Sequence, residues 1–228
     1  MKFLNKGLLL LSFLCLLLML KSSEEKLLLD SAGLLFQQFK LGNEIVFNLS
    51  CGMLISIWFY FLVVWLPEQK NKKRVKTYFI SQYAEFKRHL IMNIVGACRE
   101  PDSADLIDNL MDPLAFKVYF KEKVTGNQER WHVFLNNIDK NLLVDILNEF
   151  EAFKEATYYL LGSVQVDDDE VFSFLHRINT ISITFKGVSV EGDSLKQLSR
   201  LLWEMLAGFS GIDGYRDYDY FDKMFRKI

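Results

Sequence analysis

The 228-residue chain has little of what marks several familiar protein classes, with only three residues each of cysteine, proline and histidine. Three scattered cysteines are too few for a disulfide framework. The formal net charge of -2 gives no reason to expect a nucleic-acid partner. Half of the residues are hydrophobic and 14% are aromatic, which excludes a disordered or collagen-like chain. Length and composition together indicate one or at most two folded domains.

Motifs that would identify a reaction are also missing. The sequence has no G-x-x-x-x-G-K-[ST], G-x-G-x-x-G or G-x-S-x-G pattern. Nucleotide binding through a P-loop or Rossmann turn and the usual serine hydrolase chemistry therefore lack support. We predict no catalytic residue and no cofactor from the sequence.

The histidines and the cysteines offer no clear site either. The histidines are His89, His132 and His176, which form no H-E-x-x-H pair, so a shared metal site would need all three to converge. His89 follows Lys87 and Arg88 in a basic stretch that is typical of a solvent-facing surface. Cys98 lies outside the apolar runs, and we expect it to be a small buried residue without a nucleophilic role.

Two long apolar runs stand in the first third of the chain. Residues 45–66 read IVFNLSCGMLISIWFYFLVVWL, and 22 uncharged residues in a helix would cover roughly 33 Å, enough to span a bilayer. Residues 7–20 are also apolar and, following Lys2 and Lys6, resemble the front of a secretory signal peptide. Extended back to Phe3, this run could cross a bilayer as a helix if Lys6 reaches the headgroups. Because the residues after this run offer no A-x-A-like cleavage site, we expect a second, uncleaved span there.

The distribution of lysine and arginine predicts how these spans are oriented. The densest basic cluster comes after the second span and consists of Lys70, Lys72, Lys73, Arg74 and Lys76. Such clusters remain on the cytoplasmic side, so we expect both termini in the cytoplasm and residues 21–44 as a short external loop. The cluster is also expected to bind anionic lipid headgroups. The predicted location is the plasma (inner) membrane, with two crossings and membrane lipids as partners.

The rest of the chain, residues 67–228, is predicted to be an all-helical cytoplasmic domain joined to a membrane anchor at residues 1–66. The prolines, at positions 67, 101 and 113, are each expected at a junction between helices. An amphipathic helix is predicted over residues 75–97. Its apolar stripe consists of Val75, Phe79, Tyr83, Phe86, Leu90, Ile94 and Ala97.

Further helices are indicated by capping residues and apolar periodicity. We predict helices after Ser103, over residues 113–122, after the acidic residues 167–169 and from Asp193, and a last short helix containing Tyr215, Tyr218, Tyr220, Phe221 and Phe225. Between Gly126 and Gly162 the pattern predicts one long helix or two nearly collinear ones. Residues 181–190 are ambiguous, because their alternating β-branched residues fit either a small hairpin or a continued helix.

An acidic segment near the carboxyl end, GIDGYRDYDYFD, is the candidate metal site. Its possible ligands are Asp213, Asp217, Asp219 and Asp222, whose carboxylates suit Ca²⁺ or Mg²⁺. The segment lacks the ligand order and the closing glutamate of an EF-hand. A metal-dependent enzyme that uses this loop is therefore the third of three functional hypotheses.

The first hypothesis is a membrane-anchored helical module that binds another protein and is not catalytic. The second is an oligomeric membrane effector or channel-like protein that is gated by its cytoplasmic domain. Small and polar residues in one half of the second span favour helix pairing, and hence a homo-oligomer formed through the spans. These residues are Asn48, Ser50, Gly52 and Ser56.

Overall fold

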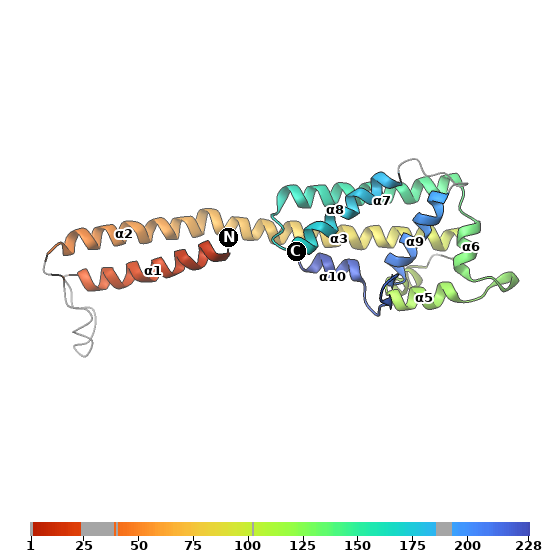
Figure 1. The fold of residues 1–228 in the computed structure, drawn as a ribbon, viewed down its shortest axis with the longest axis horizontal. Coiled ribbons are helices and arrows are strands. Elements are labelled where there is room, and N and C mark those ends of the chain that lie inside the picture. The colour runs from red at the N-terminus through yellow and green to blue at the C-terminus, as the bar shows by residue number, and fades with distance from the viewer. Residues whose placement is uncertain (1, 24–38, 40, 102, 186–192) are drawn as a thin grey trace. The chain divides into compact units, whose positions relative to one another are not determined.

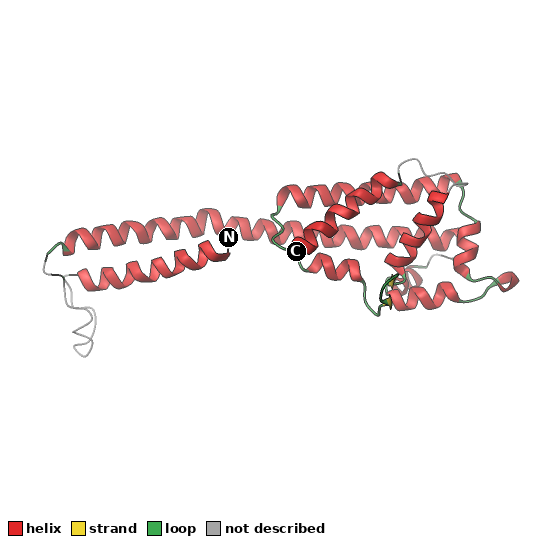
Figure 2. Cartoon of the chain, viewed as in Figure 1, coloured by secondary structure: helices red, strands yellow, loops and turns green. Residues whose placement is uncertain are grey.

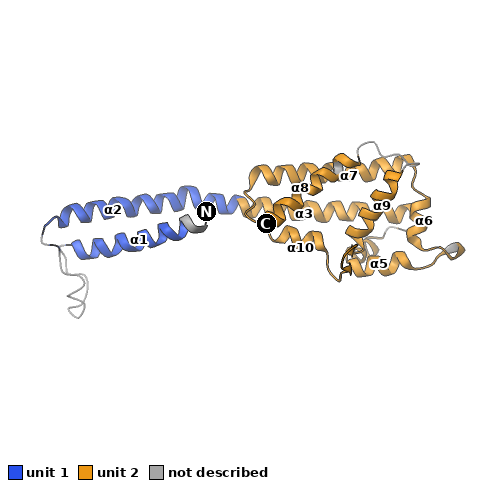
Figure 3. Ribbon diagram, in the orientation of Figure 1, with its two compact units in different colours: residues 1–71 blue, residues 72–228 orange. Residues whose placement is uncertain are grey.

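The computed structural model describes residues 2–23, 39, 41–101, 103–185 and 193–228, and nearly all of these are helical (Figures 1 and 2). The chain divides into two compact units, residues 1–71 and residues 72–228, which Figure 3 colours separately. The all-helical class that the sequence predicts is confirmed.

The first unit contains two apolar helices that lie side by side, α1 (Lys2–Ser22) and α2 (Asn43–Tyr60). The hydroxyl of Tyr60 donates a hydrogen bond of 3.5 Å to the side-chain oxygen of Asn5. Two helices are long and apolar enough to cross a membrane, and only 11% of the most apolar stretch of each is buried. A core helix of a soluble domain would bury most of that surface.

The second apolar helix does not end at Pro67, so the predicted junction there is wrong. The π-helical segment η2 (Phe61–Trp65) and then α3 (Leu66–Ala97) continue α2 as one 55-residue helix. Proline has no N–H to donate to the carbonyl four residues earlier, and its ring crowds that carbonyl. That carbonyl belongs to Val63, which lies inside η2. In a π-helix each N–H donates to the carbonyl five residues earlier, as the N–H of Leu66 does to the carbonyl of Phe61. This wider turn accommodates the proline.

The second unit is built around the part of α3 that comes after Asn71. The predicted stripe is confirmed, since six of its seven members are buried and Ala97 is half-buried. The buried residues of the helix are Val75, Phe79, Tyr83, Phe86, Lys87, Leu90, Ile91, Ile94 and Val95. Lys87 is the unexpected member of this set.

Two short helices lie where the sequence predicts them, and side-chain caps begin both. Ser103 accepts a hydrogen bond from the N–H of Leu106 and begins α4 (Ala104–Leu110). Asp112 does the same for Ala115 at the start of α5 (Pro113–Lys121), in which proline takes the first helical position. The short 3₁₀ turn η3 (Thr125–Asn127) comes next.

The segment between Gly126 and Gly162 forms two helices that are not collinear. The predictions of one long helix and of two nearly collinear helices are therefore both wrong. Figure 1 shows α6 (Arg130–Asn136) running across the direction of α7 (Lys140–Ser163). The side chain of Asn137 donates a 2.8 Å hydrogen bond to the carbonyl of Ala97, which fixes the turn after α6. Asp139 then caps α7 by accepting the N–H of Leu142 at 2.8 Å.

Helix α8 (Asp169–Thr184) begins as predicted, with Asp168 accepting hydrogen bonds from two N–H groups of the first turn. Residues 181–184 are helical, so a hairpin that begins at 181 is wrong. Residues 186–190 of that prediction lie outside the described residues. Helix α9 (Asp193–Leu206) comes next in the described chain.

A two-residue β-ladder occurs at a place where the sequence predicts none. Strands β1 (Phe209–Ser210) and β2 (Gly214–Tyr215) are antiparallel, with Phe209 opposite Tyr215. Tyr215 was expected in the last helix, but α10 covers only Tyr220–Arg226. Gly208 has a φ of 63°, and a Cβ there would lie 2.9 Å from the carbonyl oxygen of Arg216, so this turn requires glycine.

The centre of the second unit is an aromatic core shared by α3, α7 and α10. Phe153 of α7 stacks on Phe86 with ring centroids 4.7 Å apart, and on Phe79 at 5.4 Å. Phe225 of α10 packs edge-on against Phe79 and Tyr83, at 4.9 Å from each. Both geometries are favourable for aromatic pairs. This core holds the short carboxyl-terminal helix against the long α3.

Candidate functional site

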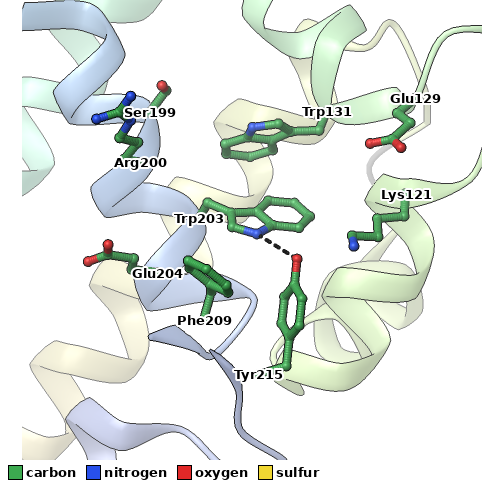
Figure 4. A pocket seen from close by; sticks show the side chains of 9 residues that line it. All are labelled: Lys121, Glu129, Trp131, Ser199, Arg200, Trp203, Glu204, Phe209 and Tyr215. Atoms are coloured by element: carbon green, nitrogen blue, oxygen red, sulfur yellow. Dashed lines mark hydrogen bonds between the residues drawn. The ribbon is translucent and has the colours of Figure 1, made fainter. Parts of the chain in front are cut away.

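An open pocket of about 400 Å³ lies where α5, α6, α9 and the β-ladder meet (Figure 4). The residues that line it come from segments far apart in the sequence. They are Lys121, Glu129, Trp131, Ser199, Arg200, Trp203, Glu204, Phe209 and Tyr215. A concave surface assembled from this many elements is the first candidate for a binding site.

Aromatic rings form the wall of this aromatic pocket. Trp203 of α9 lies with its ring centroid 4.8 Å from that of Trp131 in α6. Its indole N–H donates a 3.3 Å hydrogen bond to the hydroxyl of Tyr215, drawn as the dashed line in Figure 4. The β-ladder pairs Tyr215 with Phe209, whose ring is 5.1 Å away. The wall is therefore fixed by both aromatic ring contacts and a hydrogen bond.

Charges of both signs surround the aromatic wall. In Figure 4, Lys121 and Glu129 lie on one side of Trp203, and Arg200 and Glu204 lie on the other. The ammonium group of Lys121 lies 4.8 Å from the centroid of the Tyr215 ring, a cation–π arrangement. Rings surrounded by a mixed polar rim are typical of surfaces that bind other proteins.

The aromatic pocket holds no pairing of a nucleophile with a base. The hydroxyl of Ser199 donates to the carbonyl of Lys196 in its own helix, at 2.8 Å. It makes no hydrogen bond with a carboxylate of the pocket. A serine nucleophile needs an adjacent base within hydrogen-bond reach, so the geometry gives hydrolysis no support.

Three of the four candidate metal ligands of the acidic segment are used in separate ion pairs, and the fourth, Asp217, is exposed. Asp213 pairs with Arg216 at 2.6 Å, and Asp222 pairs with Arg226 at 2.6 Å. Within the ranges that the structure describes, no three His, Cys, Asp or Glu side chains gather as metal ligands. The metal hypothesis stays a prediction, and this geometry gives it no support.

Asp219, another of these candidate metal ligands, belongs to a buried polar cluster. Its carboxylate accepts hydrogen bonds from the ammonium group of Lys87 at 2.6 Å and from the Tyr83 hydroxyl at 2.9 Å. Lys87 also donates to the carbonyl of Met111 at 2.7 Å. Burial, followed by the charge of Asp219, raises the pKa of Tyr83 well above its ordinary value. Tyr83 is therefore a neutral hydrogen-bond donor at physiological pH.

The expectation that Lys87 faces solvent is wrong, because only 2% of the residue is exposed. Such a charge is tolerated in the interior because Asp219 and a backbone carbonyl bind it. All three side chains of this buried polar cluster are satisfied by one another or by the backbone. Such a cluster leaves no group available to a substrate.

A second polar cluster surrounds Arg130 at the start of α6. Its guanidinium donates to Glu100 at 2.7 Å and to the carbonyl of Tyr119 at 3.1 Å, and it also pairs with Glu122. Burial raises the pKa of Glu100, but hydrogen bonds from Tyr119 and Arg130 outweigh it, so that the pKa is lowered overall. Glu100 is therefore an anion that joins α5 and α6 to the end of α3.

Cys98 lies beside this cluster and does not have the properties of a nucleophile. Burial, followed by the charge of Glu100, raises the pKa of the thiol to about 11. The reactive thiolate is then scarce at neutral pH. The thiol instead contacts the carbonyl of Arg130 at 3.6 Å. His89 likewise has a partner in the fold, Glu149, at 3.1 Å.

Two lysines of the basic cluster, Lys72 and Lys76, contact the ends of other segments of the second unit. Lys72 donates to the carbonyl of Gln165 at 3.4 Å, and Lys76 donates to that of Arg226 at 2.7 Å. Lys70 and Lys73 are exposed. Arg74 lines a separate open pocket of about 370 Å³.

The residues that form the aromatic pocket were not recognised in the sequence as a site. Trp131 lies in the segment that was predicted to be one long helix or two nearly collinear ones, and Tyr215 was assigned to a helix. Trp203 offered a usable signal, because this large aromatic residue lies beside the apolar stripe of α9 and not on it. The stripe consists of Leu195, Leu198, Leu202 and Met205. An aromatic side chain in that position must either be exposed or cover a neighbouring element.

A comparison with protein-family models, curated proteins and solved structures finds no match to this chain.

Proposed function

We propose that this protein is a membrane-anchored helical module that binds another protein and catalyses no reaction. The observation that carries the proposal is the aromatic pocket, in which Trp131, Trp203 and Tyr215 line an open volume between charges of both signs. Tryptophan, tyrosine and arginine supply most of the binding energy at protein interfaces. A surrounding polar rim excludes water from such a centre.

The anchor in this proposal is a transmembrane hairpin of α1 and α2, with the second unit in the cytoplasm. The length and apolar surface of both helices support it. The five basic residues from Lys70 to Lys76 support a cytoplasmic second unit, because positively charged segments are retained on that side. Both termini are then cytoplasmic.

The first test is Trp203→Ala in the full chain, purified with a tag from its native membrane after mild crosslinking. We expect at least one co-purifying polypeptide to be bound about thirtyfold more weakly, since truncating an interface tryptophan costs about 2 kcal/mol or more. Quantitative mass spectrometry of the purified complexes measures the loss.

Two further variants make this test specific. Tyr215→Ser removes the exposed ring of the same pocket and should weaken the same polypeptide. Phe172→Ala removes a ring that is 44% exposed on α8, outside the pocket, and should leave binding unchanged. If every co-purifying polypeptide survives both pocket substitutions, the pocket is not the binding site and this proposal fails.

Self-association through α2 is a second candidate, favoured by the surface that this helix leaves uncovered. Asn48, Gly52 and Ser56 are spaced by four residues and are all exposed, so they form one small and polar stripe on α2. A Cβ atom added to Gly52 would meet nothing within 4 Å, so packing within this chain does not require glycine there. Small residues that let helices approach closely favour pairing in membranes.

Gly52→Ile tests this candidate. The added Cβ meets no atom of its own chain, so the monomer should remain folded, whereas a helix pair that is packed at this stripe should dissociate several times more readily. The measurement is energy transfer between labelled copies of the chain in vesicles, with Ile55→Val as the control. Equal transfer in wild type and in Gly52→Ile would exclude pairing at this stripe.

A further inference from the structure

The open pocket that contains Arg74 has the chemistry of a phosphate site. It is lined by Arg74, Val75 and Tyr78 from α3 and by Tyr159 from α7. The two tyrosine rings meet edge to face with centroids 5.9 Å apart, and the residues are 46% and 50% exposed. Val75 is buried and supplies an apolar floor. A guanidinium and two phenol groups therefore surround one accessible volume.

The two lysines on either side of Arg74 in the sequence add positive charge near this pocket. Lys72 and Lys76 donate to backbone carbonyls, which carry no net charge. Burial lowers the pKa of Lys76, and repulsion from Lys72 and Arg226 lowers it further. Over residues 67–100 the chain has 8 basic and 3 acidic residues. An anion bound here would relieve this repulsion.

The position of the pocket along α3 indicates where such an anion comes from. Arg74 stands eight helical positions after Leu66, the last residue of the apolar run. At 1.5 Å per residue this is about 12 Å along the helix, within reach of lipid headgroups for a long arginine side chain. Exposed tyrosines are also typical of the boundary between the apolar core of a membrane and water.

We propose that Arg74, Tyr78 and Tyr159 form a binding site for the headgroup of an anionic phospholipid. The guanidinium and the phenol hydroxyls donate hydrogen bonds to the phosphate, while Val75 and the ring faces contact the apolar part of the lipid nearest to it. Lys72 and Lys76 add long-range attraction. This site rests on the membrane anchoring proposed above and is independent of protein binding at the aromatic pocket.

The test uses the delipidated full chain in a neutral detergent. Short-chain phosphatidylglycerol and phosphatidylcholine are added in turn, and native mass spectrometry counts the lipids bound. We expect one phosphatidylglycerol to bind at concentrations at which phosphatidylcholine does not. Arg74→Gln with Tyr159→Leu should raise the half-saturating concentration about tenfold, because one charge and one hydrogen bond are lost.

The control is Arg177→Gln with Tyr218→Leu, which makes the same chemical changes at exposed positions on α8 and before α10. This control should leave the binding of phosphatidylglycerol unchanged. Tyr159→Phe keeps the ring and should weaken binding only about threefold, which separates loss of a donor from loss of folding. Equal binding of both lipids, or equal loss in the control, would overturn the proposal. So would displacement of the lipid by equimolar glycerol 3-phosphate, which would indicate a site for free phosphate.

Failure of this site and failure of the anchor can be told apart. Alkaline carbonate washing of native membranes leaves a spanning protein in the pellet. A chain that stays in the pellet but shows no preference for phosphatidylglycerol contradicts the lipid site alone. A chain that is released into the supernatant contradicts the anchor and, with it, the lipid site.

Discussion

Replacing Asp219 by alanine is expected to lower the free energy of unfolding of the second unit by about 3–5 kcal/mol. The substitution leaves the ammonium group of Lys87, which is 2% exposed, without its counter-charge. It also removes the acceptor of the Tyr83 hydroxyl and the residue that caps α10. The measurement is chemical denaturation of the full chain in detergent, followed by near-ultraviolet circular dichroism, which reports on packed aromatic side chains.

Two companion variants show whether burial causes this effect. Asp213→Ala breaks an ion pair whose carboxylate is 58% exposed, and it should cost less than about 1 kcal/mol. Lys87→Met combined with Asp219→Ala removes both charges and should recover much of the loss, because no unpaired charge remains inside. If Asp219→Ala and Asp213→Ala lower the free energy of unfolding equally, the buried polar cluster contributes no more to stability than a surface ion pair does.

The second large effect is expected from Phe153→Ala, at about 3–5 kcal/mol of lost stability. The ring of Phe153 is in contact with rings from two other helices, including Phe86 at 4.7 Å and Phe225 at 5.9 Å, and the residue is 4% exposed. Removing it leaves a cavity at the junction of α3, α7 and α10, which helices can fill only in part. The same denaturation experiment measures the change.

Phe172→Ala is the matched control for the core substitution. It deletes the same side chain from a position that is 44% exposed, so the cost should stay below about 1 kcal/mol. Phe153→Leu retains most of the side-chain volume, so its loss of stability should lie between those of Phe153→Ala and Phe172→Ala. A small cost for Phe153→Ala would mean that the aromatic core rearranges to fill the space.

Local patterns in the sequence were sufficient to predict most helices of the second unit. The three- and four-residue spacing of apolar residues identified the buried face of α3 because that spacing matches the helical repeat. Ser103 and Asp168 marked the starts of their helices because a side-chain oxygen there binds backbone N–H groups that lack partners. Each of these signals involves residues within a few positions of one another.

The predictions were wrong where an unusual backbone geometry, or a contact between residues far apart in the sequence, determines the structure. Pro67 was expected to break a helix, but a π-helical turn accommodates it. Lys87 looked like part of a basic surface because its partner, Asp219, is 132 positions away. Its spacing of four from both Tyr83 and Ile91 did place it on the buried face, and that signal could have been used.

The candidate site was the least predictable part. Trp203 and Tyr215 lie twelve positions apart and meet through a β-ladder whose strands have two residues each. Strands this short leave almost no alternation to detect. The neighbouring Trp131 comes from α6, whose direction depends on the turn at Asn137. Convergence of this kind arises from tertiary packing and cannot be read from local periodicity.

The long sequence separation within the buried polar cluster also affects how the protein is made. During synthesis Lys87 and the aromatic face of α3 emerge well before Asp219 and Phe225 exist. At roughly 5–20 residues per second, the ribosome needs on the order of ten seconds to produce the intervening 132 residues. Throughout that interval Lys87 lacks its counter-charge and Phe79 lacks its contact with Phe225. The packing of α3 is therefore completed only after α10 has been translated.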